Sequence, residues 1–338
     1  MLKKLTIAAV LALSIALTGC TAEKPIESFY IGTGAHQCYA AVGDSLMTAT
    51  TTSVRVFDAK GEAVLDKSCN FKYPTISENA DNAVVYDIGG TNVVYLDGSA
   101  LDAKNNIISA DLSQSGHLAL CTEEAGYKGS VTVYSADKTE VYKWLSADNW
   151  VVKAAVSPEG TRLAVLVSGE NGSIVKLFKL DSTDEQGSFA ADQAVFNDIC
   201  WLGERVCCIA SDRLYFCSDT GKVEDEYSFD GNFLDMFAVC GDNIVLELRA
   251  HSYGGAGTLV SIDSSANLVG TAKPGAEIET FDFSNGKLLC LTQNKLLCYD
   301  DSLNLGFEAE QTGAQTALLR SSDALLISGA EVKTTDIN

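Results

Sequence analysis

The sequence is poor in the residues and motifs that carry most enzyme chemistry. It has only three histidines and four prolines among 338 residues. It contains no His-Glu-x-x-His zinc-protease motif, no Gly-x-Ser-x-Gly nucleophile elbow and no Walker A phosphate-binding loop. It also lacks any Cys-x-x-Cys pair, so none of its eleven cysteines has the usual spacing of a structural zinc site. We therefore predict no catalytic residue, no bound metal ion and no cofactor.

The sequence has no apolar run of ordinary transmembrane length. The run at 5–17 follows two lysines and is followed by small residues, the layout of a secretory signal. Residues 17–20, Leu-Thr-Gly-Cys, resemble the bacterial lipobox, in which the cysteine is acylated and the peptide before it is removed. The resemblance implies a signal peptide over 1–19, a lipid on Cys20, a linker over 20–25 and an extracytoplasmic, membrane-anchored location. A plain signal peptide that happens to contain a cysteine is the alternative.

Basic side chains are outnumbered by acidic ones. The chain has 24 lysines and arginines against 45 aspartates and glutamates, a formal net charge of -21. The acidic residues are spread along the chain, which indicates a solvated acidic surface and not a disordered acidic tail. Such a surface repels the phosphates of nucleic acids and anionic lipid headgroups. We expect no nucleic-acid partner, and contact with the membrane only through the lipid.

One sequence unit recurs along the chain: an apolar run ends near an aspartate, turn residues follow, and a second run begins. The aspartates are 36–44 residues apart. Aspartate and glycine suit hairpin turns, which need positive φ or a side chain that bonds to the turn backbone. The spacing fits four short strands with their turns, which is one blade of a β-propeller. The eight aspartates are Asp58, Asp97, Asp137, Asp181, Asp219, Asp263, Asp300 and Asp336.

A second turn precedes each aspartate by about 20 residues. Its clearest copy is 157–164, Ser-Pro-Glu-Gly-Thr-Arg-Leu-Ala, which resembles the turn of WD40-like and TolB-like bacterial propellers. Residues 219–223, Asp-Thr-Gly-Lys-Val, resemble a fragment of the quinoprotein-type repeat. The whole chain is similar to uncharacterised β-propeller lipoproteins of bacteria. The resemblance implies the fold and transfers no catalytic residue.

These repeats predict an all-β fold, a β-propeller of about eight four-stranded blades over residues 26–338. The last repeat ends two residues after its aspartate and so lacks an outer strand. The segment 26–31 supplies a spare strand. We predict that this N-terminal strand completes the last blade and closes the ring, because an open ring exposes a sheet edge. Seven blades with one irregular repeat is the alternative.

Ten cysteines remain when Cys20 is set aside, and they lie in apolar strand-like runs such as 206–209. Buried free cysteine behaves as a small hydrophobic residue, which is the reading we favour. Oxidation of cross-strand pairs stays open, for example between Cys290 and Cys298.

The predicted fold also indicates where a binding site lies. In each blade we name the strands a to d from the ring centre outward. The b–c loops and d–a links emerge on one face around the central channel, and loops on a rigid scaffold commonly carry binding. Two b–c loops, 123–129 and 249–257, are long, and the d–a link 146–150 adds a tryptophan. Aromatic residues and arginine are enriched at binding hot spots. The predicted binding residues are Tyr127, Lys128, Trp150, Arg249, His251 and Tyr253. The alternative is that these are variable surface loops, with Trp150 packed between blades.

Two functions fit these features. The first is a monomeric, non-catalytic binding or scaffold module for an envelope protein, which predicts an exposed aromatic or apolar patch. The second is binding or hydrolysis of an extracellular small molecule, glycan or peptide, which predicts convergent carboxylates at the channel mouth. The missing catalytic motifs favour the first, although a propeller fold alone implies neither.

Overall fold

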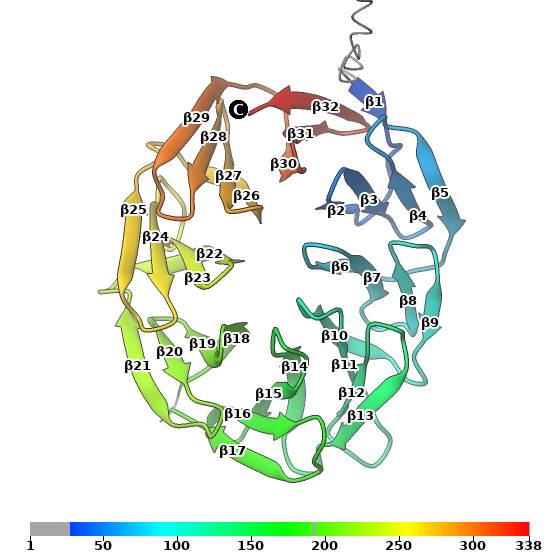
Figure 1. The fold of residues 1–338 in the computed structure, drawn as a ribbon, viewed down its shortest axis with the longest axis vertical. Helices are drawn as coiled ribbons and strands as arrows, with labels where there is room; N and C mark the ends of the chain where they lie inside the picture. Colours follow the sequence, from blue (N-terminus) through cyan, green and yellow to red (C-terminus); the bar gives the residue numbers. More distant parts are fainter. Residues whose placement is uncertain (1–27, 192–193, 338) are drawn as a thin grey trace, which may run out of the picture.

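The computed structural model describes residues 28–191 and 194–337 and arranges them as eight four-stranded antiparallel sheets in a ring (Figure 1). The prediction of an all-β propeller with eight blades is confirmed, and the seven-bladed alternative is wrong. Cys20, the predicted signal peptide and the linker lie outside the described residues. Within the described ranges, no helix is long and apolar enough to span a membrane.

The first four blades each use four consecutive strands. Blade 1 consists of β2 (Cys38–Val42), β3 (Ser45–Ala49), β4 (Ser53–Phe57) and β5 (Ala63–Ser68). Blade 2 consists of β6 (Pro74–Glu78), β7 (Ala83–Asp87), β8 (Asn92–Tyr95) and β9 (Ala100–Asp102). Blade 3 consists of β10 (Ile107–Leu112), β11 (Leu118–Thr122), β12 (Ser130–Tyr134) and β13 (Glu140–Leu145). Blade 4 consists of β14 (Trp150–Val156), β15 (Arg162–Gly169), β16 (Gly172–Lys179) and β17 (Glu185–Phe189).

The next three blades follow the same order. Blade 5 is β18 (Phe196–Leu202), β19 (Arg205–Ala210), β20 (Arg213–Cys217) and β21 (Val223–Ser228). Blades 6 and 7 are β22 (Phe233–Cys240), β23 (Asn243–Arg249), β24 (Thr258–Asp263), β25 (Leu268–Ala272), β26 (Ile278–Ser284), β27 (Lys287–Thr292), β28 (Lys295–Asp300) and β29 (Leu305–Glu310).

Blade 8 combines strands from both ends of the chain. Its strands are β30 (Thr316–Leu319), β31 (Asp323–Ser328), β32 (Glu331–Asp336) and, from the N-terminus, β1 (Ser28–Tyr30). β1 runs antiparallel to β32, and Phe29 lies opposite Val332. Figure 1 shows this junction, where the first strand (blue) meets the last strand (red). Closure of the ring by the N-terminal strand is therefore confirmed.

The c–d turns explain why the repeat contains aspartate. The carboxylate of Asp58 accepts hydrogen bonds from the N–H groups of Lys60 and Glu62, both at 2.9 Å. Asp263 and Asp300 make the equivalent pairs of bonds in their own blades. The aspartate does not take this position in every blade: the turn bonds place Tyr95 of blade 2 and Ser135 of blade 3 where blade 1 has Asp58, and Asp97 and Asp137 follow two residues later. In blade 5 the hydroxyl of Ser218 takes the capping position, so that Asp219 lies one residue later and points elsewhere.

The hydrophobic core lies between blades. The b strands are buried on both faces; the apolar run of β15, for example, is fully covered. Cys290 and Cys298 lie on opposite faces of blade 7, because Cys290 is opposite Leu297 and Cys298 is opposite Leu289. The disulfide offered as an example is therefore wrong. The ten described cysteines are free, and seven of them are buried.

The antiparallel order gives the ring two different faces. The a–b and c–d turns gather at one end, which we call the turn face. The b–c loops and d–a links gather at the other end, which we call the loop face. The predicted binding residues lie in loops of the loop face or at the strand ends beside them.

Candidate functional site

Exposed aromatic side chains concentrate on the loop face. The described residues include six exposed tyrosine, tryptophan or phenylalanine side chains, and five of them lie in loop-face links or at the strand ends beside them. The sixth, Tyr30, is on the closing strand β1. The five loop-face residues are Tyr73, Tyr127, Trp150, Phe233 and Tyr253. Exposed aromatic side chains supply the amphipathic contact area that is enriched at protein interaction sites.

One predicted group forms where blades 3 and 4 meet. Lys128 lies in the b–c loop of blade 3 and places its Nζ 4.4 Å from the ring centroid of Trp150, at the start of β14. The backbone N–H of Lys128 donates to the carbonyl of Ser146 at 2.7 Å, which ties the loop to the neighbouring d–a link. Trp150 is 59% exposed, so it does not pack between blades as the alternative held. Tyr127 beside it is also exposed.

A second predicted group forms on blade 6. The rings of His251 and Tyr253 stack with centroids 5.2 Å apart and an interplanar angle of 6°. Tyr253 is 85% exposed. Blade 5 separates this loop from β14, and no contact joins the two groups among the described residues. The structure thus places five of the six predicted residues in two separate clusters on the loop face.

Arg249 belongs to neither cluster, because it is the last residue of β23 and is buried. Its guanidinium lies 3.0 Å from Glu247, 2.7 Å from Asp235 and 2.8 Å from Glu277. Glu247 is fully buried, and this burial raises the pKa of its carboxyl even though Arg249 opposes the shift. The guanidinium therefore compensates the buried carboxylate of Glu247 and is not displayed for a partner. The sequence could not reveal this, because the strand extends one residue into the segment expected to be loop.

A cleft of about 630 Å³ opens on the loop face beside blade 7. Its lining includes Glu277, Glu279, Gln293 and Asn294. Carboxylates at the channel mouth are what the ligand-binding alternative predicted. One of the two, Glu277, is paired with Arg249.

The inner strands place polar groups along the channel, where they have structural roles. The N–H of Leu112 donates to the hydroxyl of Ser77 at 2.8 Å, and the N–H of Leu319 donates to Asp282 at 2.7 Å. Each bond joins neighbouring blades and satisfies a donor on the exposed edge of an innermost strand. Lys153 lies 2.5 Å from Asp198 of the next blade. Burial opposes the charge of Lys153, but the nearby aspartates outweigh it and raise its pKa.

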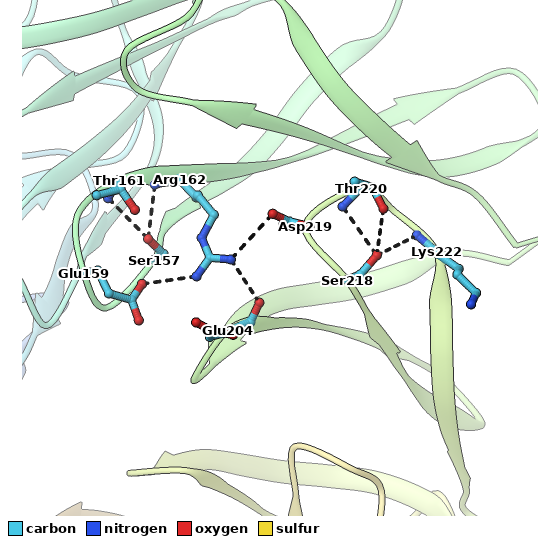
Figure 2. A network of polar contacts seen from close by, with 9 residues as sticks. All are labelled: Ser157, Glu159, Thr161, Arg162, Glu204, Ser218, Asp219, Thr220 and Lys222. Atoms are coloured by element: carbon cyan, nitrogen blue, oxygen red, sulfur yellow. Dashed lines mark hydrogen bonds and ion pairs between the residues drawn. The ribbon is translucent and has the colours of Figure 1, made fainter.

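A larger cleft, of about 700 Å³, lies on the turn face between blades 3, 4 and 5. At its centre Arg162, the first residue of β15, reaches toward Glu159, the carbonyl of Glu204 and Asp219 (Figure 2). The hydroxyl of Ser157 accepts hydrogen bonds from backbone N–H groups of the same a–b turn and so fixes its shape. The residue-by-residue prediction missed this cleft. The sequence feature that could have indicated the cleft is the 157–164 turn, which contains Arg162.

The sequence matches the model of a family described as "Family of unknown function (DUF5711)" over residues 22–335. The chain belongs to this family. Among curated proteins, none matches the DUF5711 chain.

Solved structures support the fold of this DUF5711 protein. The computationally designed Ika8 protein is 12% identical with a TM-score of 0.67, and the match covers 93% of this chain and 99% of that one. The C-terminal WD40 domain of Sif2 is 8% identical with a TM-score of 0.62, covering 92% and 97%. The Dos1 propeller is 13% identical with a TM-score of 0.61, covering 93% and 94%. At these identities the likeness shows the fold alone, and it confirms the WD40-like character of the propeller.

Proposed function

We propose that this protein is a monomeric, non-catalytic binding module that is held outside the cytoplasm by a lipid on Cys20 and docks an envelope protein on its loop face. The observation that supports this function is that five of the six exposed aromatic side chains of residues 28–191 and 194–337 lie on that face. The rim formed by Tyr127, Lys128 and Trp150 is the centre of the proposed surface. The lipid anchor is supported by the lipobox-like residues 17–20.

The chemistry of the rim defines the partner. Trp150 and Tyr127 supply apolar area and polar edges, the combination that dominates hot spots in protein interfaces. The chain carries a net charge of -21, so long-range attraction favours a partner surface with basic residues. We therefore expect a protein surface with an apolar pocket for Trp150 and lysine or arginine residues around it.

The experiment is cross-linking of the lipid-anchored protein in cells, followed by affinity recovery and mass spectrometry. The test variant is Trp150→Ala with Tyr127→Ala. The matched control is Leu305→Ala, because Leu305 is 50% exposed but lies on the outer strand β29, near the turn face. We expect one envelope protein to be recovered with wild type and control and lost with the test variant. Recovery of no stoichiometric partner, or equal recovery with the test variant, would overturn the proposal.

The lipid anchor has a separate test. Cys20→Ser removes the acylated thiol and leaves the propeller sequence intact. We expect the wild type to incorporate labelled fatty acid and to fractionate with membranes, and the variant to do neither. Labelling of the variant equal to that of the wild type would contradict acylation at Cys20.

The loop-face cleft beside Glu279 favours a second candidate, the binding or hydrolysis of a small molecule, glycan or peptide. This function predicts a ligand whose binding is lost in Glu279→Gln and retained in the Trp150 variant. The aromatic surface and the cleft are thereby tested independently.

A further inference from the structure

We propose that the turn-face cleft around Arg162 is a binding site for a short peptide segment that carries one carboxylate and a neighbouring cationic side chain. The cleft lies at the opposite end of the ring from the loop face, so this inference does not rest on the docking function. Its volume of about 700 Å³ falls within the range of roughly 300–1,000 Å³ that is usual for ligand pockets.

The guanidinium of Arg162 has hydrogen-bond donors that lack a close acceptor. Its guanidinium has five N–H donors. Its nearest polar contacts are 3.4 Å to the carboxylate of Glu159, 3.5 Å to the carbonyl of Glu204 and 3.9 Å to the carboxylate of Asp219. Each of the other five arginines, all within the described residues, has a carboxylate oxygen at 3.1 Å or closer. Arg162 alone is held loosely enough to accept a new anion.

Arg205 occupies the equivalent position in the next blade but has close partners that Arg162 lacks. Arg205 is the first residue of strand b in blade 5, as Arg162 is in blade 4. Both side chains reach toward the c–d turn of the next blade. Arg205 is held by Asp225 on β21 of its own blade at 2.6 Å and by the carbonyl of Ser264 in the c–d turn of blade 6 at 2.8 Å. The arginine that begins strand b is therefore fully paired in blade 5, whereas in blade 4 its guanidinium is available to a ligand.

The indole ring of Trp201 holds the guanidinium of Arg162 in a fixed orientation. Its guanidinium lies 5.1 Å from the ring centroid of Trp201. The indole N–H of Trp201 donates to the carbonyl of Ala155 at 2.9 Å, which fixes the ring. A guanidinium stacked on an aromatic face keeps its edge free for a planar, bidentate carboxylate. The buried indole thus presents Arg162 to the cleft.

The walls of the cleft define the rest of the ligand. Lys179 is exposed there, and within the described ranges its side chain makes no hydrogen bond or ion pair. The acidic lining residues are Glu159, Asp181, Glu204 and Asp219. Four carboxylates oppose a multiply charged anion such as phosphate, whereas they attract a cation beside the bound carboxylate. A peptide with both charges satisfies the whole lining.

The test uses the mature chain and synthetic peptides. The probe is acetyl-Lys-Ala-Ala-Glu-amide. The comparison peptides replace either its glutamate or its lysine with glutamine, and inorganic phosphate is a further probe. Binding is read from the indole N–H signals of the three tryptophans, because Trp201 lies under Arg162 while Trp150 lies on the loop face. We expect the probe to shift the Trp201 signal, to leave that of Trp150 unchanged, and to bind more tightly than either comparison peptide or phosphate.

Variants assign the effect to Arg162. Arg162→Gln should weaken binding about tenfold or more, since a charge-assisted bond is lost. Arg162→Lys should restore only part of the affinity, because the fork is lost while the charge is kept. Arg205→Gln is the matched control and should leave the affinity unchanged. Asp219→Asn removes a competing carboxylate and should tighten binding of the peptide that lacks lysine, a gain that misfolding does not produce.

Three results would overturn the proposal. The first is that the probe leaves the Trp201 signal unshifted. The second is equal affinity for the probe and the peptide without a carboxylate. The third is an unchanged affinity in Arg162→Gln. None of these results bears on the loop face, which Trp150 reports separately.

Discussion

A Cβ atom built on Gly187 would lie 2.0 Å from the carbonyl oxygen of Thr220. Gly187 is on β17, the outer strand of blade 4, and Thr220 is in the c–d turn of blade 5. Gly270 and Ser302 repeat this relationship between blades 6 and 7, also at 2.0 Å. Glycine in the outer strand therefore lets the backbones of neighbouring blades come into direct contact.

Gly187→Ala is expected to destabilise the protein by about 1–3 kcal/mol, because backbone must move to accommodate the methyl group. The matched control is Gly306→Ala on β29, where the nearest atom to the new Cβ is the Cys298 carbonyl at 3.8 Å. The control should change stability by less than about 1 kcal/mol, with a gain from the lower entropy of the unfolded chain. Denaturant midpoints measure both. Equal effects of the two substitutions would contradict the contact.

The closing strand gives a second prediction. Phe29 is buried and its ring lies 5.7 Å from that of Phe57 in blade 1. Phe29→Ala is expected to lower the free energy of unfolding by about 3 kcal/mol. Its neighbour Tyr30 is 75% exposed, and Tyr30→Ala should cost less than about 0.5 kcal/mol. If thermal melting showed the two variants to be alike, β1 would not contribute to closure in solution.

Glu78 gives a pH prediction. It ends the inner strand β6, where its side chain is exposed to solvent. Desolvation by the surrounding protein, together with the negative charge of Asp282 on β26, nevertheless raises the pKa of its carboxyl to about 8. The folded state therefore holds this proton more tightly than the unfolded state. The resulting stability is fully present below the ordinary pKa of a glutamate, about 4.3, and is lost as the pH rises through about 8.

Glu78→Gln cannot ionise, so we expect it to be more stable than the wild type at pH 9 and to approach it at pH 5. Urea midpoints between these pH values measure the difference. Glu310→Gln, at an exposed position of β29, controls for the loss of one negative charge. A difference that is constant with pH would show that Glu78 ionises normally.

The cysteines give a fourth prediction. Seven of the ten described cysteines are buried, and burial raises the pKa of Cys207 and Cys208. At neutral pH a thiol reagent should react rapidly with at most three thiols of the native mature chain, Cys38, Cys69 and Cys200. All ten should react after unfolding without reductant. Fewer than ten would show that disulfides form.

The sequence allowed the fold to be predicted because turn chemistry repeats. A hairpin turn needs an aspartate or serine cap and a residue with positive φ, such as Gly61, so the repeat shows the blade boundaries directly. The N-terminal strand was recognisable because the last repeat had no outer strand. The sequence could not show that Ser218 and not Asp219 caps the c–d turn of blade 5, because either side chain can accept hydrogen bonds from the N–H groups of a turn.

The surfaces were predicted less well, because they depend on contacts between blades. Trp150 and Tyr253 were correctly expected on exposed loop-face segments. Arg249 was not recognised as buried, since its partners Asp235 and Glu277 are supplied by other strands and links. The turn-face cleft was missed for the same reason: Arg162 and Asp219 are distant in the sequence and meet only when blades 4 and 5 pack.

Closure by β1 also gives the ring a mechanical weak point. In the part of the chain that the structure describes, three residue pairs join β1 to β32, whereas β15 and β16 in blade 4 are joined by eight. The chain leaves β1 toward its N-terminus, so tension applied through that end reaches these three pairs before any other sheet. A molecule tethered by its N-terminus and pulled by a bound partner would first peel off β1. That event would open the ring at blade 8 while the other seven blades kept their own four strands.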